Sequence, residues 1–472
     1  MKIKNTDNQF IKFWCLIILT IIIAYFTTSV LSYLFFLLIM RAFFLSKTNN
    51  YFWVAFWLVI IDGPGDLFSV GLPALYGEIT IINIIPLVLL YKSLFSYNKN
   101  IKLVFRNDYY FLICMLFIYF LLGFVYGMTL NNILNTGLIF ILWTSLFSLP
   151  RLLSQNDIIN LDRIFFTVVF VAFFCQLITL FTGTRIIDYI HPSLYSPQSY
   201  IEMSDTIIAR YMSSPYIILY SLIKALYYMN VKKTLFTSKY LSSIITSAFF
   251  SIFLTGTRGW ILAAFILILI YLFFFGRQVL KKMMIIVFIG IIIIKFSIML
   301  SPKLQQQIDG VFIRLQTLEY LAKGDITMDN KLWRVTNRAP KVLAPFYKKP
   351  LFGEGFSTVY WENRDRHVGH ATILLNTGIV GYLIFSFFLL RWFYKIFTIS
   401  NVNKAVKRNY ANAPKIISFA FIFIFVIHST SHMFWGFDLE IGPVFVISML
   451  LTTFNDILIT STYDKSRHAH FS

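Results

Sequence analysis

Residues 351–385 read LFGEGFSTVYWENRDRHVGHATILLNTGIVGYLIF and place a charged segment directly before a long apolar run. Gly353 and Gly355 come before the charged segment, and Gly378 and Gly381 lie within the apolar run that follows it. An apolar run of about 20 residues is long enough to cross a lipid bilayer as an α-helix. The charged segment would then lie at the membrane surface, where that helix begins. It contains Glu354, Glu362, Arg364, Asp365, Arg366, His367 and His370.

Apolar runs of this kind recur along the whole chain of 472 residues, of which 58% are hydrophobic and 13% are charged. The mean hydropathy is +0.72, which is far above that of a soluble domain of this size. Repeated runs of roughly 17–25 residues predict a polytopic, all-α membrane protein, whereas a membrane β-barrel would show short alternating segments. The first run, residues 13–26, could pass for a signal peptide, but it lacks a small-residue cleavage site, so we expect a retained helix.

We predict about fourteen transmembrane helices, with twelve as the lower bound, in one integral membrane domain that covers residues 1–472. Such segments cross a bilayer as helices because every backbone polar group is then satisfied within the segment. The predicted spans are residues 9–27, 28–45, 52–69, 77–95, 110–128, 131–149, 162–182, 209–229, 238–256, 259–276, 282–300, 372–395, 414–433 and 438–458.

The charges orient these spans, because the formal net charge of +20 falls entirely on one side of the predicted membrane. Cytoplasmic connections are enriched in Lys and Arg, so both termini are expected in the cytoplasm and the basic composition does not indicate nucleic-acid binding. Two long loops then face outward, residues 183–208 and residues 301–371. The second loop is the larger one and contains RLQTLEYLAKGD, residues 314–325, which predicts a short amphipathic helix. The basic connections are residues 41–47, 91–106, 230–239, 276–282 and 391–415.

The three cysteines, Cys15, Cys114 and Cys175, each lie inside an apolar run and are far apart in sequence. This spacing argues against disulfides and against a zinc site. We expect all three thiols to be buried and to pack as small apolar groups.

Four arginines on the outward side are candidates for binding an anion. Arg258 lies in LTGTRGW between two spans, and Arg210 begins the span that follows the first long loop. Arg334 and Arg338 stand four residues apart in LWRVTNRAP, so a helix would place both on one face. Guanidinium groups suit phosphate because they donate two parallel hydrogen bonds and stay charged. Interfacial anchoring or plain ion pairs are the alternative interpretation of the same residues.

His367 and His370 stand three residues apart at the start of the predicted span 372–395. A histidine can accept a proton from a hydroxyl near neutral pH. The pair could also begin the helix in a purely structural role, and it lacks a third ligand at a spacing that would indicate a metal site.

Three segments together resemble the superfamily of O-antigen polymerases and O-antigen ligases. Residues 254–273, LTGTRGWILAAFILILIYLF, resemble its Ser-Arg-Gly element followed by a helix. Residues 350–356, PLFGEGF, resemble its Pro-Leu-x-Gly-x-Gly turn, and residues 367–385 resemble its His-Asn-x-x-Leu segment that runs into a Gly-Ile-x-Gly helix. The order and the predicted topology agree over residues 205–395.

The chain departs from this pattern at several positions. Thr257 replaces the serine before the arginine, and Val368 replaces the asparagine that usually follows the histidine. Spacing to the glycine of Gly-Ile selects His367, whereas His370 lies nearer the membrane and could do the same work. Arg334 comes closest to the family's loop arginine, and Arg338 stands where a tryptophan is expected.

The resemblance implies a metal-independent, lipid-linked glycosyltransferase of the GT-C kind, without a cofactor, in the bacterial cytoplasmic membrane. It implies that an oligosaccharide on undecaprenyl diphosphate is the donor at the periplasmic face. Arg258, Arg334, Arg338 and Arg210 would bind the diphosphate, and His367 or His370 would be the catalytic base or orienting group. An acidic residue in the first outer loop is common in such transferases, which makes Asp62 a further candidate. The alternative interpretation is that Asp62 only forms part of a turn.

The residue bias toward Phe, Ile, Lys, Asn and Tyr and the number of spans favour an O-antigen polymerase, for which a chain-length regulator protein is an expected partner. An O-antigen ligase, which transfers the glycan to lipid A core, is the alternative. A lipid-linked oligosaccharide flippase is a second alternative. Flippases usually lack one dominant outer loop and would carry charge inside the spans of both halves, so the loop asymmetry of this chain favours the enzyme.

Overall fold

A computed structural model describes most of the chain as helix. The described residues are 4–27, 29–46, 49–62, 74–76, 79–80, 84–95, 103–182, 214–231, 236–255, 258–275, 302–322, 334–402, 412–423 and 442–455, with isolated residues at 288, 292 and 295. One short antiparallel pair of strands, β1 (Ala74–Tyr76) and β2 (Ile79–Thr80), interrupts the helices within these ranges.

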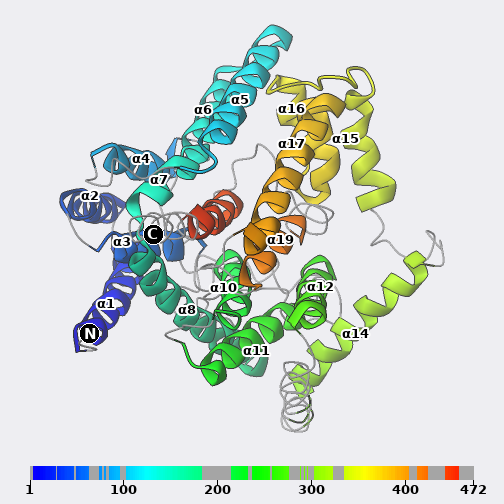
Figure 1. The fold of residues 1–472 in the computed structure, drawn as a ribbon. Coiled ribbons are helices and arrows are strands. Elements are labelled where there is room, and N and C mark those ends of the chain that lie inside the picture. The colour runs from blue at the N-terminus through cyan, green and yellow to red at the C-terminus, as the bar shows by residue number, and fades with distance from the viewer. Residues whose placement is uncertain are drawn as a thin grey trace, which may run out of the picture.

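The helices follow the apolar runs of the sequence (Figure 1). Two short turns, the π-helical turn η5 (Arg334–Arg338) and the 3₁₀ turn η6 (Arg366–Val368), lie near the last long helix. The helices are α1 (Lys4–Phe26), α2 (Ser29–Leu45), α3 (Asn50–Asp62), α4 (Ile85–Phe95), α5 (Arg106–Tyr126), α6 (Leu130–Trp143), α7 (Ser145–Leu152), α8 (Gln155–Thr182), α10 (Pro215–Tyr228), α11 (Ser238–Leu254), α12 (Arg258–Phe275), α14 (Pro302–Ala322), α15 (Ala339–Phe346), α16 (Thr358–Asn363), α17 (Gly369–Val402), α19 (Ala413–Ile422) and a last helix, Gly442–Asn455.

The prediction of a helical fold is confirmed, and four helical stretches among the described residues are long and apolar enough to cross a membrane. Several other helices are equally apolar but shorter. Large apolar side chains on the outer faces stay exposed, among them Val125 of α5 at 76% and Phe273 of α12 at 84%. Such a surface is suited to contact with lipid. The four long stretches are Arg106–Tyr126, Leu130–Leu152, Gln155–Thr182 and Arg366–Thr398.

Some predicted spans differ from the structure, and the break in the span predicted at residues 372–395 is described with the candidate site below. The span predicted from residue 77 is wrong at its start, because Ile79 and Thr80 form β2 and α4 begins only at Ile85. The span predicted at residues 131–149 consists of α6 and α7, which meet at Thr144. The span predicted at residues 282–300 lies outside the described residues, apart from isolated positions.

The helix predicted at residues 314–325 is confirmed over residues 314–322 as the second half of α14, and residues 323–325 lie outside the described residues. The first half of α14 packs through Leu304 and Ile308 against Leu180 of α8 and Leu254 of α11. The Gln307 side chain is buried and donates to the Leu254 carbonyl at the end of α11 over 2.6 Å. The predicted outer loop therefore begins with a helix that is anchored to the bundle.

All three cysteines are free, and Cys15 and Cys114 are exposed. The prediction that the cysteines pack inside is therefore wrong for these two. The reason is that α1 and α5 turn apolar faces outward, where Ile18 and Phe124 are 54% and 63% exposed. A thiol is a small apolar group and is equally compatible with such a face.

Helix α10 is buried along nearly its whole length and contacts α3, α8, α11 and α19 (Figure 1). It carries a charge into the interior, because Lys224 Nζ lies 3.1 Å from Asp162 Oδ2 of α8 and both side chains are inaccessible to solvent. Tyr220 and Tyr228 donate to the two Asp162 oxygens over 2.8 and 2.5 Å, and Lys224 donates to Thr453 Oγ1 over 3.1 Å. This polar cluster ties α8, α10 and the last helix together.

Candidate functional site

Helix α17 is broken at Gly378, where the backbone has φ 63° and ψ −172°. A residue with a side chain is strained in this left-handed region, and a Cβ at Gly378 would overlap the Leu351 carbonyl. The glycine in NTGIVG is therefore required by the conformation and by the close approach of another backbone segment.

That other segment is the turn at residues 350–356, PLFGEGF, which we call the glycine turn. Breaking a helix releases backbone groups that are costly to leave unpaired in an apolar setting. The glycine turn forms hydrogen bonds with backbone groups on both sides of the break. We call the glycine turn and the broken segment of α17 together the joint. The hydrogen bonds are Glu354 N–H to Leu375 O (2.8 Å), Gly355 N–H to Asn376 O (2.9 Å), Ile379 N–H to Pro350 O (2.9 Å) and Val380 N–H to Leu351 O (3.0 Å).

The glycine turn is also wedged against α5. A Cβ at Gly355 would lie 2.6 Å from the Tyr119 carbonyl, and a Cβ at Gly123 would lie 2.6 Å from the Phe356 backbone. The Tyr119 hydroxyl donates to the Thr377 carbonyl over 2.9 Å, one residue before the break. Three segments that are far apart in sequence therefore meet at backbone contact.

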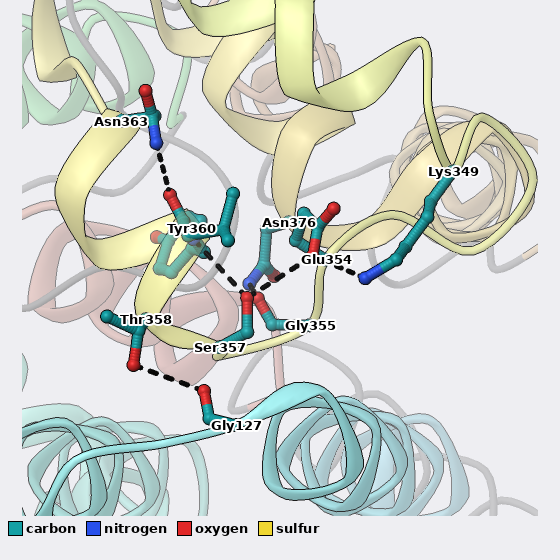
Figure 2. Close-up of polar contacts among 10 residues, drawn as sticks. Gly127, Lys349, Glu354, Gly355, Ser357, Thr358, Tyr360, Asn363 and Asn376 are labelled. Carbon is teal, nitrogen blue, oxygen red and sulfur yellow. Dashed lines mark hydrogen bonds and ion pairs between the residues drawn. The ribbon is translucent and has the colours of Figure 1, made fainter.

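Figure 2 shows the polar side chains around the glycine turn. The Asn376 amide donates to the Gly355 carbonyl over 2.7 Å. Glu354 is only 3% exposed, and its carboxylate pairs with Lys349 Nζ at 2.8 Å. Thr358 binds the Gly127 carbonyl with its N–H and its hydroxyl. The first acidic residue of the charged segment is therefore part of the scaffold.

Asp365 joins a cation to the histidine segment. Its Oδ2 lies 3.4 Å from Arg338 Nη1, and its Oδ1 accepts the His367 N–H over 2.9 Å at the start of η6. The Asp365 backbone is fixed in turn by Thr372, whose hydroxyl donates to the Asp365 carbonyl over 2.7 Å. Arg338 and Asp365 are partly exposed, so the pair adds at most about 1 kcal/mol to stability but sets where the guanidinium stands.

The two histidines differ in their surroundings. The His370 side chain is half-buried, and its Nδ1 lies 3.0 Å from the Tyr382 hydroxyl on the other side of the break. The His367 side chain is exposed. Arg338 is therefore linked through Asp365 to the segment that carries His367 and His370 at the start of α17. The sequence analysis placed the two histidines there but gave no reason to expect Arg338 beside them.

The other predicted arginines are not brought together by the described residues. Arg258 is the first residue of α12 and Arg334 the first residue of η5, but the side chains of both lie outside the described part of the structure. Arg210 lies wholly outside the described residues.

Asp62 has a structural role in the fold. Its carboxylate oxygens accept the N–H groups of Tyr216 and Ile217 over 3.3 and 2.7 Å. These N–H groups belong to the first turn of α10, where a carboxylate satisfies unpaired donors and complements the helix dipole.

Asp365 and Tyr382 contact candidate site residues, and the sequence analysis assigned neither of them a role. An aspartate just before a helix start is a recognisable capping signal, so the role of Asp365 in η6 could have been found. No local signal marks Tyr382, because its contact with His370 depends on the break in α17.

The described residues hold no group of three or more His, Cys, Asp or Glu side chains that could bind a metal ion. In comparisons with known proteins, no family model and no curated protein matches this chain.

Proposed function

We propose that the protein is a membrane-integral glycosyltransferase that takes glycan from an undecaprenyl-diphosphate-linked donor at the periplasmic face of the bacterial cytoplasmic membrane. The observation that carries this proposal is the joint at Gly378. A broken apolar helix has Arg338, held by Asp365, and two histidines gathered at its start. Irregular backbone inside an apolar helix is tolerated where it is buried in protein or lines a site.

The residues suit the chemistry of this transfer. The acceptor hydroxyl oxygen attacks the anomeric carbon of the donor and forms the new glycosidic bond. The bond from that carbon to the phosphate oxygen breaks, and the lipid diphosphate leaves with the electron pair. A histidine accepts the hydroxyl proton.

The leaving diphosphate gains charge, so it needs fixed cations near it. In this proposal Arg338 is one of them, and Arg258, Arg334 and Arg210 supply the others from the same predicted side. The guanidinium of Arg338 is already oriented by Asp365. A bound diphosphate would either share this guanidinium with the carboxylate or replace the carboxylate as its partner. No cofactor takes part in the proposed reaction.

Polymerase activity is our first choice, and ligase activity is the alternative within the same chemistry. A polymerase joins repeat units on the lipid carrier, whereas a ligase moves the finished glycan to lipid A core. A lipid-linked oligosaccharide flippase is the second candidate. The buried pair of Asp162 and Lys224 favours it, because ionisable residues inside a membrane often mark transport pathways.

One experiment separates these candidates. Purified protein in vesicles is mixed with a short undecaprenyl-diphosphate-linked repeat unit, without lipid A and without added metal. The polymerase proposal expects longer lipid-linked products. If the glycan moves only after lipid A core is added, the ligase alternative replaces it. If the lipid-linked glycan changes leaflet without any new glycosidic bond, the protein is a flippase.

A further inference from the structure

The contact between His370 and Tyr382 exists only because α17 is broken. The two residues lie 12 positions apart, and a straight helix of that length would separate them by about 18 Å along its axis. Across the break at Gly378 their rings lie 6.0 Å apart, centre to centre, and the hydroxyl reaches Nδ1 at 3.0 Å. The glycine turn fixes the angle of the break through four backbone hydrogen bonds. The whole joint therefore determines where the His370 ring stands.

We infer that Tyr382 is a positioning residue that orients His370, and that His370 rather than His367 accepts the acceptor's proton. This inference rests on the proposed glycosyltransferase function. It adds a residue that neither the charged segment nor the histidine spacing identifies.

The physical reason lies in the two ring nitrogens of histidine. The hydrogen bond made by one nitrogen decides which of the two carries the proton. When His370 Nδ1–H donates to the Tyr382 oxygen, Nε2 holds the lone pair and can accept a proton. The imidazolium formed by that step donates a stronger, charge-assisted bond to the same oxygen. Tyr382 would thus stabilise the ring most when the transfer takes place.

The surroundings of the two histidines support the choice. His370 is half-buried at the start of α17, and its Nδ1 contacts the Tyr382 hydroxyl in the second half of the helix. The His367 side chain is exposed, and its segment is fixed through the backbone by Asp365. A catalytic group works best when it is already oriented.

The first test needs no enzymatic activity. Full-length protein labelled with ¹⁵N-histidine is compared by NMR with Tyr382→Phe, and the His370 signals are assigned by their loss in His370→Ala. We expect the wild-type ring to carry its proton on Nδ1, and the Tyr382→Phe ring to shift toward the Nε2–H tautomer. An unchanged tautomer in Tyr382→Phe would overturn the positioning role, whatever reaction the protein catalyses.

The second test measures glycan transfer. His370→Ala should lower kcat by roughly 10²–10⁴-fold, as expected for loss of a proton acceptor. Tyr382→Phe should lower kcat by roughly 10–100-fold with little change in KM. The reason is that this variant removes a hydroxyl that orients the proton-accepting ring of His370 but touches no substrate. The control is Tyr394→Phe, which changes an exposed tyrosine on the same helix and should leave the rate unchanged.

The outcomes separate this inference from the proposed function. If His367→Ala abolishes transfer while His370→Ala retains it, the choice of histidine is wrong but the glycosyltransferase proposal stands. If wild-type protein transfers no glycan although the tautomer changes as expected, the proposed function fails and the orienting contact remains. Equal kcat in Tyr382→Phe and wild type would overturn the positioning role of Tyr382 and would leave the glycosyltransferase proposal standing.

Discussion

Gly378 is the residue on which the joint depends, because its left-handed backbone leaves no room for a Cβ. Gly378→Ala should lower the free energy of unfolding by about 2–5 kcal/mol. That range combines the strain of a left-handed alanine with the overlap against Leu351. Thermal unfolding in detergent measures the effect.

The matched control is Gly137→Ala in α6, where an added Cβ meets no atom within 4 Å. Alanine is the better helix former by about 0.5–1 kcal/mol, so this variant should unfold at the same or a higher temperature. Similar melting temperatures for Gly378→Ala and Gly137→Ala would show that the joint does not depend on glycine.

Arg258 is the residue at which phosphate recognition can be tested by side-chain shape. Arg258→Ala should abolish glycan transfer without impairing membrane insertion, because it removes a cation that we propose to face the diphosphate. Arg258→Lys should recover little, since an ammonium group cannot reproduce the two parallel hydrogen bonds of a guanidinium. Transfer is measured with the lipid-linked repeat unit, and insertion by membrane fractionation.

Arg151→Ala is the control for Arg258, because Arg151 lies in the last turn of α7 on the predicted cytoplasmic side. This variant should transfer glycan at the wild-type rate. Full activity of Arg258→Lys would exclude paired hydrogen bonding to phosphate at that position.

At the scale of elements, the ion pair between α8 and α10 holds the centre of the bundle. Lys224→Met should lower the free energy of unfolding by about 3–5 kcal/mol, because it leaves the Asp162 carboxylate buried without its cation. Adding Asp162→Asn to this variant should restore part of the loss, since the amide oxygen keeps an acceptor for one tyrosine hydroxyl and no buried charge remains. Thermal unfolding of the single and double variants measures both steps.

Lys239→Met, which changes an exposed lysine on α11, is the control and should unfold like wild type. A double variant that is less stable than Lys224→Met would mean that the pair is not held together by charge. In that case the hydroxyls of Tyr220 and Tyr228 would require the carboxylate itself.

At the scale of the whole molecule, the asymmetry of charge predicts the orientation in the membrane. A reporter that is active only in the periplasm should be active when fused after residue 330 and silent when fused after residue 405. The reason is that Lys and Arg are retained on the cytoplasmic side. A cytoplasmic reporter at the same two positions should give the opposite pattern. An inverted result would place the start of α17, with its histidines, on the cytoplasmic side of the membrane and would rule out the proposed donor.

The sequence alone determined the helical class and most helix positions. The prediction for residues 28–45 matches α2 at Ser29–Leu45, and that for residues 238–256 matches α11 at Ser238–Leu254. These positions could be predicted because an apolar run of sufficient length is a local property of the chain. The sequence also placed His367, His370 and the charged segment before them at the start of the span that became α17.

Only the tertiary structure decided how that place is built. The sequence contains both glycine pairs, but not the fact that the glycine turn binds the backbone groups released at Gly378. The Asp365 contact with Arg338 and the Tyr382 contact with His370 were equally hidden. Each joins residues that a straight helix or an extended loop would keep apart. Apolar runs specify that helices form, whereas such contacts depend on where the helices break and which backbones approach closely enough to pair.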